Sequence, residues 1–133
     1  MDQFRYYMPT EVFFGKGIVK EKKELFRQLG QRAYIITYTI PGHHYALEDV
    51  TAVLEEFGIP YVVETGIEEN PSTETVEQAA AKARDFAPDF IIGIGGGSPI
   101  DAAKAIGVLL ANPDRKGGDL FTDGSLQSLP IIG

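Results

Sequence analysis

Residues 89–104 read DFIIGIGGGSPIDAAK, and this segment constrains the fold more than any other part of the chain. An apolar strand, Phe90–Ile94, leads into three consecutive glycines and then into a helix. Ser98 is a favoured N-cap, Pro99 suits the first helical position, and Asp101 stands where a capping box places an acid. The sequence therefore predicts a helix that begins at Ser98 and directs its free N–H groups into the glycine turn.

The glycine turn consists of Gly95, Gly96 and Gly97, whose missing Cβ atoms let a backbone bend sharply and approach a ligand closely. A tight connection without a ligand is the simpler interpretation. Two observations favour a phosphate-binding turn: three glycines exceed what a short connection needs, and open α/β sheets bind ligands at the carboxyl ends of their strands. The segment is neither the usual dinucleotide fingerprint, because Ser98 replaces its third glycine, nor a P-loop, because no Gly-Lys-Ser/Thr follows.

The rest of the chain alternates apolar strands with amphipathic helices. Strands are predicted at Glu11–Phe14, Ala33–Thr37 and Tyr61–Val63, and helices over 18–29, over 47–57, from Pro71 to the residue before Pro88, and over 100–111. This alternation indicates βαβ units. The predicted fold class is α/β, a Rossmann-like three-layer domain with a parallel sheet and helices on both faces.

Composition narrows the classes of function. The 133 residues suffice for one domain with a real core, and the net charge of −7, with acids and bases mixed, predicts no nucleic-acid site. No apolar run is long enough to span a bilayer, and the first residues are no signal peptide, so no membrane partner is expected. The absence of cysteine suits a reducing cytoplasm. His43 and His44 are adjacent, which is not the spacing of a helix-borne metal pair, so we expect loop histidines.

Three segments, in matching order and spacing, resemble the iron-containing (group III) alcohol dehydrogenase family. GGGSPIDAAKAIG at 95–107 is similar to that family's nucleotide-binding motif, PTEVFFGKG at 9–17 to its opening strand and turn, and ENPS at 69–72 to the segment before the helix that precedes the glycine strand. The resemblance implies hydride transfer between an alcohol or aldehyde and a nicotinamide cofactor. It also implies a divalent metal, iron or zinc, in the full-length enzyme, and a homo-oligomer.

The resemblance also implies which residues bind the cofactor. They are Gly95, Gly96, Gly97, Ser98, Asp101, Asn70, Thr37 and Thr39. On the family pattern the segment Gly96–Ser98 holds the pyrophosphate, Asp101 lies near the nicotinamide ribose, and Asn70 lies near the nucleotide. Lys104 also matches the motif, but a solvated helix lysine is an equally good interpretation.

The residues that end the strand at 33–37 bear on the choice of cofactor. NAD-selective members of the family place an aspartate there, which repels a 2′-phosphate, whereas this chain has Thr37, Tyr38 and Thr39 and no acid until Glu48. Thr39 can donate a hydrogen bond to a phosphate. Against this, Tyr38 stands where NADP-preferring members often have glycine, and no arginine is near. The cofactor is therefore NADP or NAD, and we favour NADP.

The resemblance covers only the amino-terminal, nucleotide-binding portion of such an enzyme. Residues 1–133 are expected to form a single, truncated dinucleotide-binding domain, because SLPIIG at 128–133 begins another buried strand. In the family a separate helical domain carries the metal ligands, one aspartate and three histidines, and none of those positions lies in this chain. We therefore expect no catalytic residue and no metal ligand here, and no dehydrogenase activity from this chain alone.

The sequence also permits three other interpretations. A glycerol dehydrogenase-like or dehydroquinate synthase-like enzyme of the same superfamily is a close alternative, although Ser98 and the Pro-Thr-Glu-Val opening favour the alcohol dehydrogenase branch. A nucleotide-binding module without catalysis is a second alternative. A receiver-like signalling domain fits poorly, because it needs an aspartate at the end of a strand, where Thr37 and Gly95 stand.

Overall fold

The computed structural model describes residues 16–38, 45–67, 72–112 and 128–133, apart from the side chains of Gly97 and Ser98. The predicted strand at 11–14, the two histidines, and two predicted cofactor residues, Thr39 and Asn70, lie outside the described residues.

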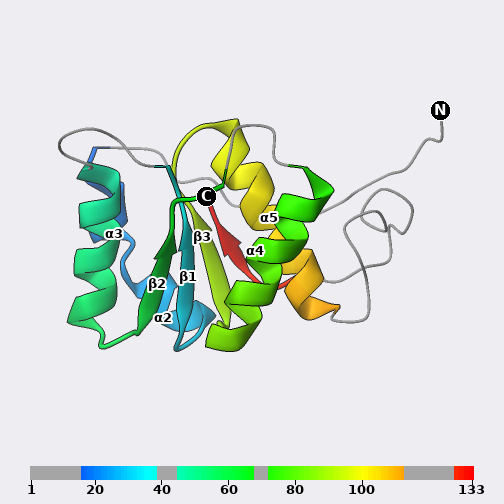
Figure 1. Cartoon of the computed structure of the whole chain (residues 1–133). Coiled ribbons are helices and arrows are strands. Elements are labelled where there is room, and N and C mark those ends of the chain that lie inside the picture. The colour runs from blue at the N-terminus through cyan, green and yellow to red at the C-terminus, as the bar shows by residue number, and fades with distance from the viewer. Residues whose placement is uncertain (1–15, 39–44, 68–71, 113–127) are drawn as a thin grey trace, which may run out of the picture.

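A parallel four-stranded sheet with the order β2-β1-β3-β4 forms the centre of the described chain (Figure 1). The strands are β1 (Ala33–Ile36), β2 (Tyr61–Glu64), β3 (Phe90–Gly93) and β4 (Ile131–Ile132). The predicted strands of the central region and the α/β class are therefore confirmed. The strand predicted near the carboxyl end also forms, but β4 is half-buried rather than buried, because β3 is its sole neighbour in the described sheet.

Helices cover both faces of the sheet, as the sequence predicts. On one face lie α1 (Ile18–Glu21), α2 (Glu24–Leu29) and α3 (Tyr45–Glu56); on the other lie α4 (Thr73–Phe86) and α5 (Gly97–Ala111), as Figure 1 shows. The single helix predicted over 18–29 is wrong, because the chain breaks at Lys22 and Lys23 into two short helices. The break lets Phe26 of α2 enter the core, whereas α1 contributes no buried residue.

The four residues of β1 are all buried, and they alternate between two cores. Tyr34 and Ile36 pack with α4 and α5, whereas Ala33 and Ile35 pack with α2 and α3. A strand that is covered on both faces has no polar side, which explains the uninterrupted apolar run in the sequence.

The ends of α4 follow the signals in the sequence. The Ser72 side chain is the N-cap and accepts a hydrogen bond of 3.1 Å from the Thr75 backbone N–H. At the other end Ala87 adopts a left-handed conformation, with φ of 56°, directly before Pro88. The predicted end of this helix before Pro88 is therefore confirmed, whereas the helix begins at Thr73, two residues later than predicted.

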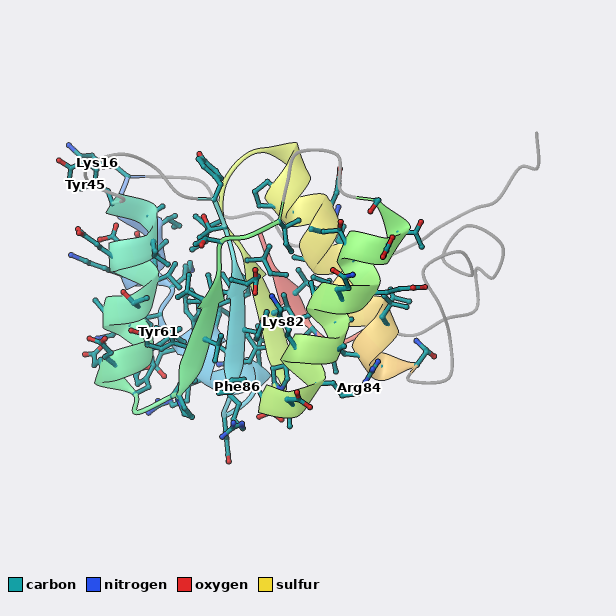
Figure 2. The ribbon with its side chains drawn as sticks, in the orientation of Figure 1. Lys16, Tyr45, Tyr61, Lys82, Arg84 and Phe86 are labelled. Carbon is teal, nitrogen blue, oxygen red and sulfur yellow. The ribbon has the colours of Figure 1, made fainter. Side chains whose placement is uncertain are left out.

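Tyr34 carries a hydroxyl group into the core beside α4. The residue is 2% exposed, its hydroxyl donates to Glu64 Oε2 at 3.4 Å, and its ring lies 6.4 Å from that of Phe86, centre to centre. Figure 2 labels Phe86 at the lower end of the sheet, below the strands. Burial and, after it, the negative charge of Glu64 raise the pKa of Tyr34 to about 12.

We predict that this raised pKa makes the fold sensitive to alkali. A tyrosine in the unfolded chain ionises near its ordinary pKa of 10.0, whereas native Tyr34 keeps its proton until about 12. The stabilisation is therefore fully present below pH 10 and is lost as the pH rises through 12. Urea unfolding measured across this range should show a fall in the free energy of unfolding that is smaller in Tyr34→Phe. Tyr45→Phe, at a position that is 72% exposed, serves as the control and should fall like the parent. An equal fall in Tyr34→Phe and the parent would contradict the prediction.

Candidate functional site

The sheet has a topological switch point between β1 and β3. The chain leaves the carboxyl end of β1 towards α3 on one face, and it leaves β3 into α5 on the opposite face (Figure 1). Open α/β sheets bind their ligands at such a point, beyond the carboxyl ends of the strands. Here Thr37 and Tyr38 follow β1, and the glycine turn, Gly95, Gly96 and Gly97, follows β3.

The helix that follows the turn begins two residues earlier than the sequence predicts. Gly96 is the N-cap of α5, with φ of −78° and ψ of −155°, and Gly97 is the first helical residue. The prediction that Ser98 is the N-cap is therefore wrong. Pro99 is the third helical residue rather than the first, which the helix tolerates because first-turn N–H groups have no intrahelical partner. Asp101 lies beyond the first turn, so the predicted capping box does not form.

The backbone conformation and the packing at position 95 require a glycine. Its φ is +134°, a conformation that residues with a side chain rarely adopt. A Cβ atom added there would collide with the ring of Tyr38 and would lie 3.1 Å from Pro99 Cγ. The close packing of the Tyr38 ring against the turn therefore requires a glycine at this position, whether or not a ligand binds.

Gly96 has no such explanation. Its backbone lies in the extended region, and a Cβ atom added there would meet no atom of the described residues within 4 Å. Among the described residues, the space beside Gly96 is therefore open. It lies directly at the start of α5, where backbone N–H groups and the positive end of the helix dipole favour an anion.

The structure brings together some of the predicted cofactor residues and leaves others apart. Thr37 lies at the switch point together with the glycine turn, but its side chain is only 1% exposed and its hydroxyl donates to the Ile94 carbonyl at 2.9 Å. Asp101 and Lys104 are exposed on α5. Direct contacts of Thr37 and Asp101 with a cofactor stay predictions.

Tyr38 is the residue whose place in the site the sequence did not reveal. Its side chain is 43% exposed and its ring packs against Gly95. An aromatic residue directly after a strand carries no pattern that points to a glycine on another strand. The contact follows from the parallel pairing of β1 with β3, which sets Ile36 opposite Gly93.

Within the described ranges, no three His, Cys, Asp or Glu side chains are grouped so that they could hold a metal ion. None of the helices in the described part is both long and apolar enough to cross a membrane.

Sheet order, crossover helices and glycine turn define the chain as a Rossmann-like α/β domain. The model of the family described as iron-containing alcohol dehydrogenase matches residues 9–132. The chain belongs to the iron-containing alcohol dehydrogenase family, and the resemblance seen in its three motifs is confirmed.

Similar proteins carry dehydrogenase names but are much longer. The chain is 36% identical over 117 residues to an NADPH-dependent butanol dehydrogenase of Clostridium saccharobutylicum, which covers 87% of this chain and 29% of that protein. It is 36% identical over 107 residues to NADH-dependent butanol dehydrogenase A of Clostridium acetobutylicum, which covers 80% of this chain and 28% of that protein. The crystal structure of an iron-containing alcohol dehydrogenase from Thermotoga maritima superposes with a TM-score of 0.86 and 37% identity, over 97% of this chain and 36% of that one.

The packing of Tyr38 on Gly95 leads to a testable coupling. Gly95→Ala is expected to lower the free energy of unfolding by about 1–3 kcal/mol, because the new Cβ strains the backbone and displaces the ring. When Tyr38→Ala removes the ring, the same change should cost about 1 kcal/mol less, and the strain of the positive φ alone should remain. A double-mutant cycle in urea measures the difference. Strictly additive effects of the two substitutions would show that the ring does not determine the glycine.

Proposed function

We propose that this chain is the dinucleotide-binding portion of an NAD(P)-dependent, metal-dependent alcohol dehydrogenase. The observation that carries the proposal is the open space beside Gly96, at the start of α5 and at the switch point of the sheet. A nucleotide pyrophosphate carries the negative charge that the start of a helix favours. The membership of the family and the names of the similar proteins support the same reaction, which is hydride transfer between an alcohol or aldehyde and the cofactor.

The residues of this chain supply binding and orientation. The first turn of α5, Gly97 and Ser98, presents its backbone N–H groups to the pyrophosphate, and the turn at Gly95 and Gly96 lets the backbone come close. Asp101 near the nicotinamide ribose and Asn70 near the nucleotide complete the proposed set. The nicotinamide, when bound, accepts or donates the hydride, and the fold determines where its ring is held.

In this proposal, the residues that bind the substrate and the metal lie outside residues 1–133. The chain spans less than a third of the length of the two butanol dehydrogenases. We propose that residues 1–133 form one domain of a longer enzyme, and that residues outside this domain hold a divalent metal, iron or zinc, as the resemblance to the family implies. A cytoplasmic homo-oligomer, with no nucleic-acid or membrane partner, completes the proposal.

For the cofactor we propose NADP, with NAD as the alternative. No acidic residue stands between the end of β1 and Glu48, so no carboxylate of this segment repels a 2′-phosphate. The ring of Tyr38, packed on Gly95, is the exposed side chain nearest in sequence to that strand end. Similar proteins carry both NADPH-dependent and NADH-dependent names at the same identity, so identity alone does not decide.

A graded substitution at Gly96 tests the proposed pyrophosphate site. Gly96→Ala and Gly96→Leu place progressively larger side chains in space that the protein leaves open, so the fold is expected to persist. The affinity for NAD and NADP should fall in the same order, by about tenfold or more for leucine. Calorimetric titration gives the dissociation constants, and far-UV circular dichroism checks the fold.

Ala81→Val is the matched control, because it also adds apolar atoms, at an exposed position on α4, and it should bind like the parent. If Gly96→Leu binds both cofactors as tightly as the parent, the turn is only a connection and the proposed site is wrong.

A substitution at Thr39 tests the choice of cofactor. Thr39→Asp introduces the negative charge that NAD-selective members carry, and it should weaken NADP by about tenfold while sparing NAD, because the carboxylate repels the 2′-phosphate. Thr39→Asn has nearly the same shape without the charge and should not discriminate. Titration of both cofactors against parent and variants measures the ratio. An unchanged ratio in Thr39→Asp would place the 2′-hydroxyl elsewhere.

A further inference from the structure

Thr37 is the one polar residue with a described side chain that is buried in the described part of the chain. A buried hydroxyl costs free energy unless it is hydrogen-bonded, and here it donates to the carbonyl of Ile94 at 2.9 Å. An apolar residue would suit this position if only packing mattered, since Thr37 directly follows β1, whose four residues are all buried. Packing alone therefore does not explain the hydrogen bond from the Thr37 hydroxyl to the Ile94 carbonyl.

Ile94 is held to the end of β1 at both of its backbone polar groups. Its N–H donates to the Ile36 carbonyl at 2.9 Å, and its carbonyl accepts from the Thr37 hydroxyl. Thr37 is itself anchored on the other side, because its N–H donates to the Glu64 carbonyl at 3.1 Å. The hydroxyl thus adds one more link between β1 and β3, just beyond the last paired residues of the two strands.

This link acts on the glycine turn through the peptide bond. The carbonyl of Ile94 and the N–H of Gly95 belong to one planar peptide unit, so fixing the oxygen also fixes the direction of the N–H. Gly95 has no side chain and adopts φ of +134°, so its own preferences do little to hold the next peptide in place. The hydrogen bond from the Thr37 hydroxyl therefore restrains the orientation of the Ile94–Gly95 peptide, which the residues of the turn themselves restrain little.

We propose that Thr37 is a positioning residue for the cofactor: its buried hydroxyl, through the carbonyl of Ile94, sets the orientation of the glycine turn that receives the pyrophosphate. The inference rests on the proposed function of that turn. It differs from a direct contact, because a side chain that is 1% exposed has little surface to offer a ligand.

Removal of the hydroxyl tests the proposal in the chain itself. Thr37→Val keeps the volume and removes the donor, and it should weaken NAD and NADP equally, by about tenfold, because the turn is no longer held in its binding orientation. Thr37→Ser restores a hydroxyl on the same atom and should bind within about twofold of the parent. Thr37→Ala also lacks the donor and replaces Thr37→Val if valine does not fold.

Thr51→Val is the matched control, because Thr51 also donates its hydroxyl to a backbone carbonyl, that of Glu48 at 3.2 Å, but within α3. It should bind like the parent. A ligand-free readout accompanies the titrations: the amide resonances of Gly95 and Gly96 should shift in Thr37→Val, and should not shift in Thr51→Val. All measurements are made well below the unfolding midpoint of each variant.

The outcomes separate this inference from the proposed function. If the parent binds neither cofactor, the proposed function fails and this inference fails with it. If the parent binds and Thr37→Val binds equally well, or if Thr37→Ser does not restore the affinity, the inference alone is overturned. Loss of affinity and shifted glycine resonances in Thr37→Val, both restored in Thr37→Ser, support it.

Discussion

The pairing of β1 with β3 is the constraint on which the rest of this structure depends. β1 lies between β2 and β3, is buried on both faces, and contributes to both cores. Because the chain leaves β1 and β3 towards opposite faces, their carboxyl ends form the switch point, and the glycine turn is held there. The beginning of α5, the packing of Tyr38 and the bond from Thr37 all follow from the parallel register of these two strands.

Much of the fold was accessible from the sequence, because burial on both faces leaves an uninterrupted apolar run and capping residues mark helix ends. The limits of α4 at Ser72 and Pro88 show how far such local signals reach. These local signals gave the wrong result where the backbone conformation, and not a side-chain preference, determines where a helix begins. Ser98 is the better N-cap by preference, yet Gly96 occupies the cap, because the extended backbone there begins the helix two residues earlier. The break at Lys22 reflects the packing of Phe26, which a hydrophobic period does not encode.

The position of the candidate site could be predicted from the sequence, but the separate role of each of its residues could not. The sequence indicated a glycine turn at the end of a strand, but it treated the three glycines alike. In the structure Gly95 meets the steric demand of Tyr38, whereas Gly96 borders open space. The sequence predicts Thr37 as a cofactor residue, but it does not reveal that the buried Thr37 hydroxyl donates to the carbonyl of Ile94, directly after β3. Such contacts join segments that are far apart in the chain, so no local sequence pattern predicts them.

The bond from Thr37 to Ile94 joins residues that are 57 positions apart, with α3, β2, α4 and β3 between them. Closing so long a loop is entropically costly, and parallel pairing of distant strands is a slow event in folding. This end of the sheet therefore forms only in molecules whose central strands have already paired. Under the proposed function, a dinucleotide would bind the completed sheet and not its partly folded precursors. Its binding would then stabilise the folded state by mass action.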